Sequence, residues 1–180
     1  MIKSIIKNIL NFINVFLLYR NAPRQNVLIH PAWLIFELGI VQRIFRINAH
    51  VPWPVHWTSQ VLAPKKIKIG TRTPGLGLSC FLDGRNGVEL GDDVWIGPRV
   101  SIISQDHDSY DFTQYVDERP IKIGAHSLIA TNAIILPGVW LGAHTIVAAG
   151  AVVTKSFPEG FQVLGGNPAR VLKKLSRNNG

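Results

Sequence analysis

The chain has 180 residues, of which 47% are hydrophobic and 17% charged, so its composition excludes an intrinsically disordered protein and its length allows one full core with an appendage. A single cysteine, Cys80, excludes an intramolecular disulfide, and the formal net charge of +8 predicts an acidic partner such as nucleic acid, anionic lipid or a phosphorylated cofactor. The sequence contains neither zinc-knuckle cysteine spacing nor an aromatic RNA-binding signature, so we expect no nucleic-acid partner.

Residues 1–20 have the pattern of an amphipathic helix, because apolar residues recur at helical spacing and polar residues fill the other side. The polar interruptions are too regular for a membrane-spanning helix, which needs about 20 mostly apolar residues, and no small-residue cleavage site of a signal peptide follows. One interpretation is a helix on the inner face of the membrane, attracted to anionic lipid by Lys3 and Lys7. The other is a helix that packs on its own domain or on a neighbouring subunit. Both predict a cytoplasmic protein, and the first adds peripheral contact with the membrane.

Residues 21–66 form a segment that is rich in proline and tryptophan. The run from Ala32 to Ile47 has enough aliphatic residues for a short helix, whereas Val51 to Val61 is expected to be extended because its prolines disfavour helix. We interpret this segment as a cap. A core of stacked coils needs one, because its last rung would otherwise expose unpaired backbone and apolar side chains.

Residues 67–158 carry the most informative pattern, a six-residue period. Aliphatic residues occupy every sixth position on both sides of one interruption: Leu90, Ile96 and Ile102, then Ile123, Ile129, Ile135, Leu141, Val147 and Val153. An α-helix would scatter such positions around its axis. A short strand followed by a sharp turn instead makes one side of a triangular prism with about 18 residues per coil. The period therefore predicts an all-β parallel helix in which the repeated aliphatic side chains point inward and stack from coil to coil.

Several strings in this region resemble the hexapeptide-repeat acyltransferases: GDDVWIGP at 91–98, LPGV at 136–139, GAVVTK at 150–155 and the ending GGNPAR at 165–170. They are most similar to the branch of maltose, galactoside and nodulation-type sugar O-acetyltransferases and capsule or exopolysaccharide O-acetyltransferases. The resemblance implies a left-handed parallel β-helix, acetyl-CoA as cosubstrate, a sugar or glycan acceptor, and a homotrimer with active sites between neighbouring prisms. Residues 159–180 are expected to form a short C-terminal tail or helix.

The six-residue period breaks once and predicts a loop over residues 103–122, whose first half is polar, acidic and aromatic. A loop that leaves a rigid solenoid is a natural place for a functional site, and a neutral imidazole suits the removal of a hydroxyl proton near neutral pH. The family's catalytic histidine lies in the corresponding loop, so the resemblance gives His107 the role of general base. We expect Asp106 or Asp108 to orient its ring, and a partner from another subunit is the alternative.

The resemblance also implies where the donor and the acceptor bind. The residues that contact the pantetheine arm and the nucleotide of CoA correspond to Thr131, Ala149, Thr154 and Lys155, and basic residues that reach the phosphates correspond to Arg170 and Lys173. Small residues let an extended pantetheine lie along a flat face, while cations hold phosphate charge. Sugar-acetylating members often supply an asparagine from a preceding coil, but residues 77–80 contain none, which leaves Ser79 or Asn86 as substitutes. Further candidates for the acceptor pocket are Trp95, Tyr110 and Phe112.

Three alternative functions stay open at this point. His126 and His144 lie one coil apart in equivalent contexts and should stack, and with His107 they could form a three-histidine zinc site, as in the carbonic anhydrases built on the same solenoid. The His-x4-His pair of those enzymes is absent, so we expect no metal. A serine or other small-molecule O-acetyltransferase is disfavoured because the long helical N-terminal domain is missing. A non-catalytic scaffold is disfavoured by the polar loop around His107.

Overall fold

The computed structural model describes Ile9 and residues 38–176. Apart from Ile9, the helix predicted over residues 1–20 and the first part of the predicted cap lie outside this part of the chain. Within the described residues, no helix has the length and apolar character needed to cross a membrane.

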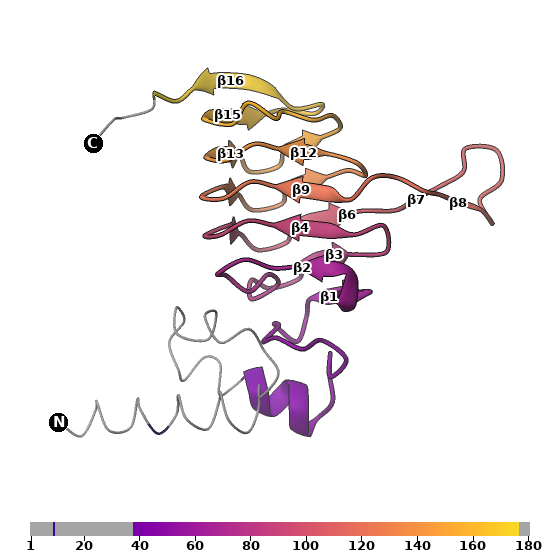
Figure 1. The fold of residues 1–180 in the computed structure, drawn as a ribbon. Coiled ribbons are helices and arrows are strands. Elements are labelled where there is room, and N and C mark those ends of the chain that lie inside the picture. The colour runs from indigo at the N-terminus through magenta and orange to yellow at the C-terminus, as the bar shows by residue number, and fades with distance from the viewer. Residues whose placement is uncertain (1–8, 10–37, 177–180) are drawn as a thin grey trace.

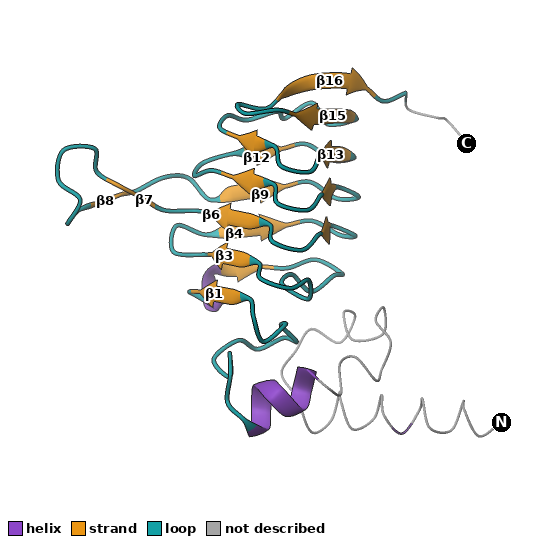
Figure 2. Cartoon of the chain, turned by 180° about the vertical axis from the view of Figure 1, so that it is seen from behind, coloured by secondary structure: helices purple, strands orange, loops and turns teal. Residues whose placement is uncertain are grey.

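Three sheets, parallel except for the last strand of the third, form the sides of a triangular column, and a hairpin projects from it (Figures 1 and 2). The first face contains β1 (Gln60–Leu62), β3 (Phe81–Asp83), β6 (Ser101–Ile103), β11 (Ile134–Ile135) and β14 (Val152–Val153). The second face contains β2 (Ile67–Lys68), β4 (Val88–Leu90), β9 (Ile121–Ile123) and β12 (Trp140–Leu141). The third face contains β5 (Trp95–Ile96), β10 (Leu128–Ile129), β13 (Thr145–Val147), β15 (Gln162–Gly165) and β16 (Arg170–Lys174). The projecting hairpin consists of β7 (Asp106–His107) and β8 (Tyr115–Val116).

The core of the column is built from the aliphatic residues of the six-residue period. Ile135 pairs with Val153 in the next coil and with Ile102 in the coil before, and all three side chains are fully buried. Partners in adjacent uninterrupted coils are 18 positions apart, as Ile135 and Val153 show, so three repeats complete one coil. The predicted all-β parallel helix with inward, stacked aliphatic side chains is confirmed.

We expect the substitution Ile135→Ala to lower the free energy of unfolding by about 2–5 kcal/mol, because it removes a fully buried side chain and leaves a cavity between two coils. Urea denaturation followed by circular dichroism measures this loss. The matched control is Ile134→Ala, since Ile134 lies on the same strand but is only partly buried. An equal loss in both variants would contradict the inward stacking of Ile135.

The corner between the second and third faces places non-glycine residues in the left-handed region of backbone conformation. The φ angles are 52° for Asp93, 56° for His126, 55° for His144 and 48° for Phe161. Aspartate and histidine enter this region more readily than most side chains do. Ring centroids are 5.0 Å apart between His126 and His144 and 4.4 Å apart between His144 and Phe161. The predicted stacking of the two histidines is therefore confirmed.

The parallel ladders extend beyond residues 67–158 in both directions. β1 pairs with β3, so the first coil already begins at Gln60, and β15 pairs with β13 at the other end. The C-terminal segment was expected to form a tail or a helix, but Arg170–Lys174 forms the strand β16, which runs antiparallel to β15. The physical reason is that β15 would otherwise leave a row of backbone groups unpaired at the end of the third face.

The described part of the proline-rich segment packs at the opposite end of the column. The π-helix η2 (Ile40–Ile44) lies within the run predicted to be helical, and the 3₁₀ helix η3 (Pro64–Lys66) follows β1. Gln42 is 1% exposed, and its Nε2 donates hydrogen bonds to the carbonyl oxygens of Val51 and Trp53. The buried Trp53 indole in turn donates to the Pro74 carbonyl, which ties this segment to the first coils.

Candidate active site

The projecting hairpin leaves the column between the first and second faces, and its base is held by Asn86 of the preceding coil. The Asn86 backbone N–H donates to the hydroxyl oxygen of the buried Ser104 at 2.9 Å, and Asn86 Nδ2 donates to the Val116 carbonyl at 2.9 Å. Gln105 Nε2 also donates to Asn86 Oδ1. Of the predicted acceptor-side residues, Asn86 is therefore the one that anchors the loop.

The imidazole of His107 is held by the loop's own backbone. Nδ1 lies 2.6 Å from the Phe112 carbonyl oxygen. Because a carbonyl oxygen only accepts, this contact places the hydrogen on Nδ1 and leaves Nε2 of the neutral ring with its lone pair. The Tyr115 ring covers the imidazole at a centroid distance of 4.6 Å. His107 thus offers Nε2 as a proton acceptor in a defined orientation.

The two aspartates that flank His107 contact backbone rather than the imidazole. Asp106 Oδ1 accepts the backbone N–H of His107 at 2.8 Å, and Asp108 Oδ1 accepts the N–H groups of Tyr110 and Asp111 at 2.8 and 3.0 Å. In the described chain, the acceptor that orients the ring is accordingly the Phe112 carbonyl, where the sequence predicted a carboxylate. The aspartates shape the turn that carries this carbonyl.

The pKa of Asp108 is lowered because the N–H groups of Tyr110 and Asp111 stabilise its charged form. This stabilisation of the turn is present above the ordinary aspartate pKa of about 3.9 and is lost as the pH falls through the lower pKa in the folded loop. We expect Asp108→Ala to speed amide hydrogen exchange of Tyr110 and Asp111 at neutral pH, as measured by NMR. The Thr113 amide, which the Asp111 carboxylate holds, is the internal control. Unchanged exchange at Tyr110 would contradict this role.

Three residues that the sequence analysis missed support the imidazole: Asp83 and Arg85 from the column, and Tyr115 from the hairpin strand β8. Asp83 is 0% exposed and accepts hydrogen bonds from Arg85 Nε and an Arg85 terminal nitrogen, both at 3.0 Å. The Asp83 carboxylate raises the pKa of Arg85 above its ordinary value. The Arg85 guanidinium lies 5.3 Å from the centre of the Tyr115 ring, which in turn packs on His107. A chain of contacts therefore runs from a buried carboxylate to the candidate base.

The residues predicted to bind the donor fall into three places. Thr131 and Ala149 share the corner between the third and first faces, one coil apart, and the Gly150 N–H donates to the Thr131 carbonyl. Arg170 directly follows Ala169, whose backbone N–H donates to the carbonyl of Val152 on the first-face strand β14. Thr154 and Lys155 follow β14 at the other edge of the first face, whereas Lys173 lies on the third face opposite Val163. The structure brings Thr131 and Ala149 together at one corner, whereas Thr154 and Lys155 lie at the far edge of the first face and Lys173 lies within the third face.

The remaining acceptor-side candidates are spread over the column. Tyr110 is fully exposed in the loop. Trp95 lies on the third face, where the Arg72 guanidinium covers its ring at 3.3 Å from the centroid. Ser79 lies in the left-handed region at a corner, and Thr58 Oγ1 accepts its backbone N–H. Among the described residues, no hydrogen bond or ring contact joins Trp95 or Ser79 to the hairpin, so the acceptor-side candidates near His107 are Asn86, Tyr110 and Phe112.

Comparison with known proteins agrees with this architecture. The family described as "Bacterial transferase hexapeptide (six repeats)" matches residues 120–155. Residues 120–155 thus carry the hexapeptide repeat of this family. The fold is the parallel β-helix that the six-residue period predicted, with the left-handed coiling that the resemblance to the hexapeptide-repeat acyltransferases implied. No three histidine, cysteine, aspartate or glutamate side chains gather within the described residues in a way that could hold a metal ion.

Proteins similar to this chain include a nodulation protein and two acetyltransferases of known structure. Nodulation protein L of Rhizobium meliloti (strain 1021) is 48% identical over 99 residues, which cover 53% of this chain and 54% of that protein. A maltose O-acetyltransferase from Clostridium difficile 630 is 29% identical with a TM-score of 0.52, covering 63% of this chain and 61% of that one. A galactoside acetyltransferase in complex with coenzyme A is 26% identical with a TM-score of 0.57, covering 66% and 63%. The chain spans about half the length of the curated relatives it matches.

Proposed function

We propose that this protein transfers an acetyl group from acetyl-CoA to a hydroxyl group of a sugar or polysaccharide precursor, with His107 Nε2 as general base. The observation that carries this proposal is the 2.6 Å contact between His107 Nδ1 and the Phe112 carbonyl, which leaves Nε2 as the free proton acceptor on an exposed loop. The galactoside acetyltransferase with bound coenzyme A supports the choice of donor. The maltose O-acetyltransferase supports a sugar hydroxyl as acceptor.

In the proposed reaction, one proton moves from the acceptor hydroxyl group to Nε2 of His107 and then to the CoA thiolate. Nε2 removes the hydroxyl proton while the hydroxyl oxygen forms a bond to the thioester carbonyl carbon. The resulting imidazolium donates through Nδ1 to the Phe112 carbonyl, which stabilises its positive charge. Collapse of the tetrahedral intermediate breaks the carbon–sulfur bond, and the thiolate takes the proton from Nε2. The products are an acetyl ester and free CoA thiol.

The surface of the column supports a homotrimer as part of this proposal. On the third face, Trp95, Leu128, Ile146 and Val163 point outward in one in-register column, and Trp95 and Leu128 are 51% and 39% exposed. Such a contiguous apolar stripe is typical of a subunit interface. Sedimentation equilibrium of the full chain tests the trimer.

Release of free CoA thiol tests the proposed reaction directly. Purified full-length protein is incubated with acetyl-CoA and a panel of maltose, galactosides, acidic oligosaccharides and serine, and the thiol is titrated with a chromogenic disulfide. Acceptor-dependent thiol release with a sugar is the expected result, and mass spectrometry should show one added acetyl ester. Release with serine alone would contradict a sugar acceptor, and failure to bind acetyl-CoA in calorimetry would contradict the whole proposal.

A further inference from the structure

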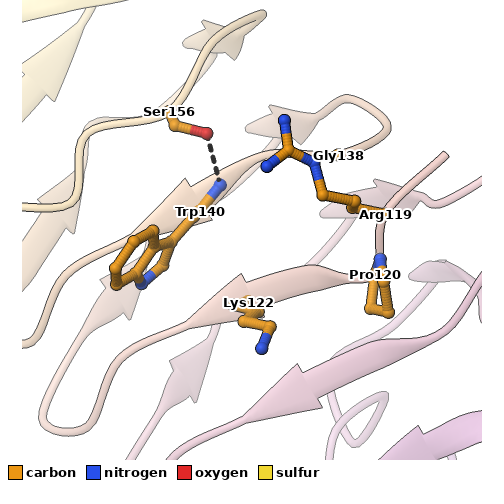
Figure 3. Close-up of a pocket in the computed structure, with 6 residues that line it drawn as sticks. All are labelled: Arg119, Pro120, Lys122, Gly138, Trp140 and Ser156. Atoms are coloured by element: carbon orange, nitrogen blue, oxygen red, sulfur yellow. Dashed lines mark hydrogen bonds between the residues drawn. The ribbon is translucent and has the colours of Figure 1, made fainter.

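A pocket of about 300 Å³ opens on the second face, immediately beyond the hairpin (Figure 3). Its lining residues are Arg119, Pro120, Lys122, Gly138, Trp140 and Ser156. This volume lies at the small end of the range of about 300–1,000 Å³ for small-molecule sites, so the pocket fits a short part of a larger ligand. None of these residues belongs to the site built around His107.

One wall of the pocket is a rigid aromatic platform. Trp140 is 52% exposed on β12, and its backbone is held on both sides: its N–H donates to Ser156 Oγ at 2.9 Å, and its carbonyl accepts from Phe157 at 2.7 Å. The Ser156 hydroxyl keeps its own hydrogen for another acceptor. An exposed indole with polar groups at its edge is suited to the apolar face of a sugar ring, whose hydroxyl groups need hydrogen-bond partners.

The opposite wall is cationic. Among the residues that the structure describes, no carboxylate forms an ion pair with Arg119, whose guanidinium faces the pocket across from Trp140 in Figure 3. Lys122 lies beneath both and shares Glu89 with Lys68, at 3.2 and 2.9 Å. A free guanidinium next to an ammonium group favours a carboxylate or phosphate, which it can bind through paired hydrogen bonds.

Gly138 lines the remaining side of the pocket, and the Glu118 carboxylate lies next to it. A Cβ atom on Gly138, whose φ is +70°, would lie 3.0 Å from Glu118 Oε2, so any side chain here would crowd that carboxylate. Because glycine has no Cβ, the Glu118 carboxylate stays uncovered next to Gly138, where it can accept hydrogen bonds from sugar hydroxyl groups. The pocket combines an aromatic face, a hydroxyl acceptor and an unpaired cation.

We infer that this pocket binds an acidic sugar residue of the acceptor glycan, with the ring on Trp140 and the carboxylate on Arg119 and Lys122. The inference rests on the proposed function in taking the acceptor to be a glycan. Arg119 follows the hairpin strand β8 (Tyr115–Val116) by three residues, so a glycan anchored here lies beside the base of the loop that carries His107. The formal net charge of +8 for the whole chain also favours an acidic ligand.

Calorimetric titration of the full chain with trigalacturonate and with the neutral galactose trisaccharide of the same linkage tests this inference. We expect at least about tenfold tighter binding of the acidic trisaccharide, because charge-assisted hydrogen bonds are stronger than neutral ones. Arg119→Gln should remove this preference and leave binding of the neutral sugar unchanged. Trp140→Ala should weaken both sugars by about tenfold, and Trp140→Phe should retain most of the affinity.

Matched controls separate the pocket from general effects of charge and fold. Arg46→Gln and Trp57→Ala remove an exposed arginine and an exposed tryptophan elsewhere and should leave both affinities unchanged. Equal affinity for the two trisaccharides, or an equal loss in the control variants, would overturn the inference. Weaker CoA binding in Arg119→Gln with unchanged galacturonate binding would assign the cations to the donor's phosphates instead. Because sugar binding is measured without turnover, failure of the acetyl-transfer assay is distinguishable from failure of this pocket.

Discussion

The substitution His107→Ala is expected to lower kcat for acetyl transfer by about 10²–10⁴-fold, the usual contribution of a general base. The physical reason is that Nε2 is the proton acceptor that the Phe112 carbonyl leaves free, and alanine offers no group to take the hydroxyl proton. The KM for acetyl-CoA should change little, because the side chain acts on the acceptor hydroxyl. Initial rates of thiol release with saturating acetyl-CoA and sugar measure the effect.

The control for this experiment is His126→Asn. His126 is an exposed histidine at a corner with a φ of 56°, and asparagine tolerates that conformation. It removes an imidazole from the stack of corner residues without touching the hairpin, so kcat should be unchanged. Full activity in His107→Ala, or an equal loss in His126→Asn, would show that His107 is not the base.

The column could be predicted from sequence because its determinants are local and repeated. Each coil buries the same aliphatic position, so the period alone gives the stacking that pairs Ile135 with Val153. The corner residues follow from the same register, which is why the stacking of His126 on His144 could be anticipated. The C-terminal strand β16 could not, because it adds antiparallel to the last rung, and no repeat encodes that pairing.

The interior of the loop was predictable only in part. A polar interruption marks where a histidine departs from the column, but the group that orients it is the Phe112 carbonyl, and a backbone carbonyl has no sequence signature. The contacts that run from Asp83 through Arg85 and Tyr115 to His107 depend on how strands of neighbouring coils are aligned. Asp83 pairs with Ile103, the last strand residue before the loop, and only this pairing places Arg85 beside Tyr115. Arg85 and Tyr115, 30 positions apart in the sequence, therefore meet only because the coils stack.

Loss of the buried carboxylate should therefore affect both stability and catalysis. We expect Asp83→Asn to lower the free energy of unfolding by about 1.5–3 kcal/mol, the typical contribution of a hydrogen bond to a charged group. The reason is that the Asp83 carboxylate is fully buried and accepts hydrogen bonds from two side-chain nitrogens of Arg85. Urea denaturation measures this loss. The matched control is Glu89→Gln, since Glu89 also contacts two cations but lies at the surface, and its variant should shift the urea midpoint far less.

The same substitution separates a positioning role from a merely structural one. Asp83 acts on the imidazole only through Arg85 and Tyr115, so at a temperature where the variant is folded, kcat should fall while the KM for acetyl-CoA stays unchanged. Arg85→Gln interrupts the same chain of contacts, and the effects of the two substitutions on kcat should be far from additive in the double variant. Additive effects, or a kcat in folded Asp83→Asn equal to that of the parent protein, would show that the buried ion pair stabilises the coil without holding the base. If Asp83 does position the base, Tyr115→Ala should cause the same loss of kcat, because the Tyr115 ring is the group that contacts the imidazole. The loss of stability should be smaller than in Asp83→Asn, because the Tyr115 side chain is 52% exposed.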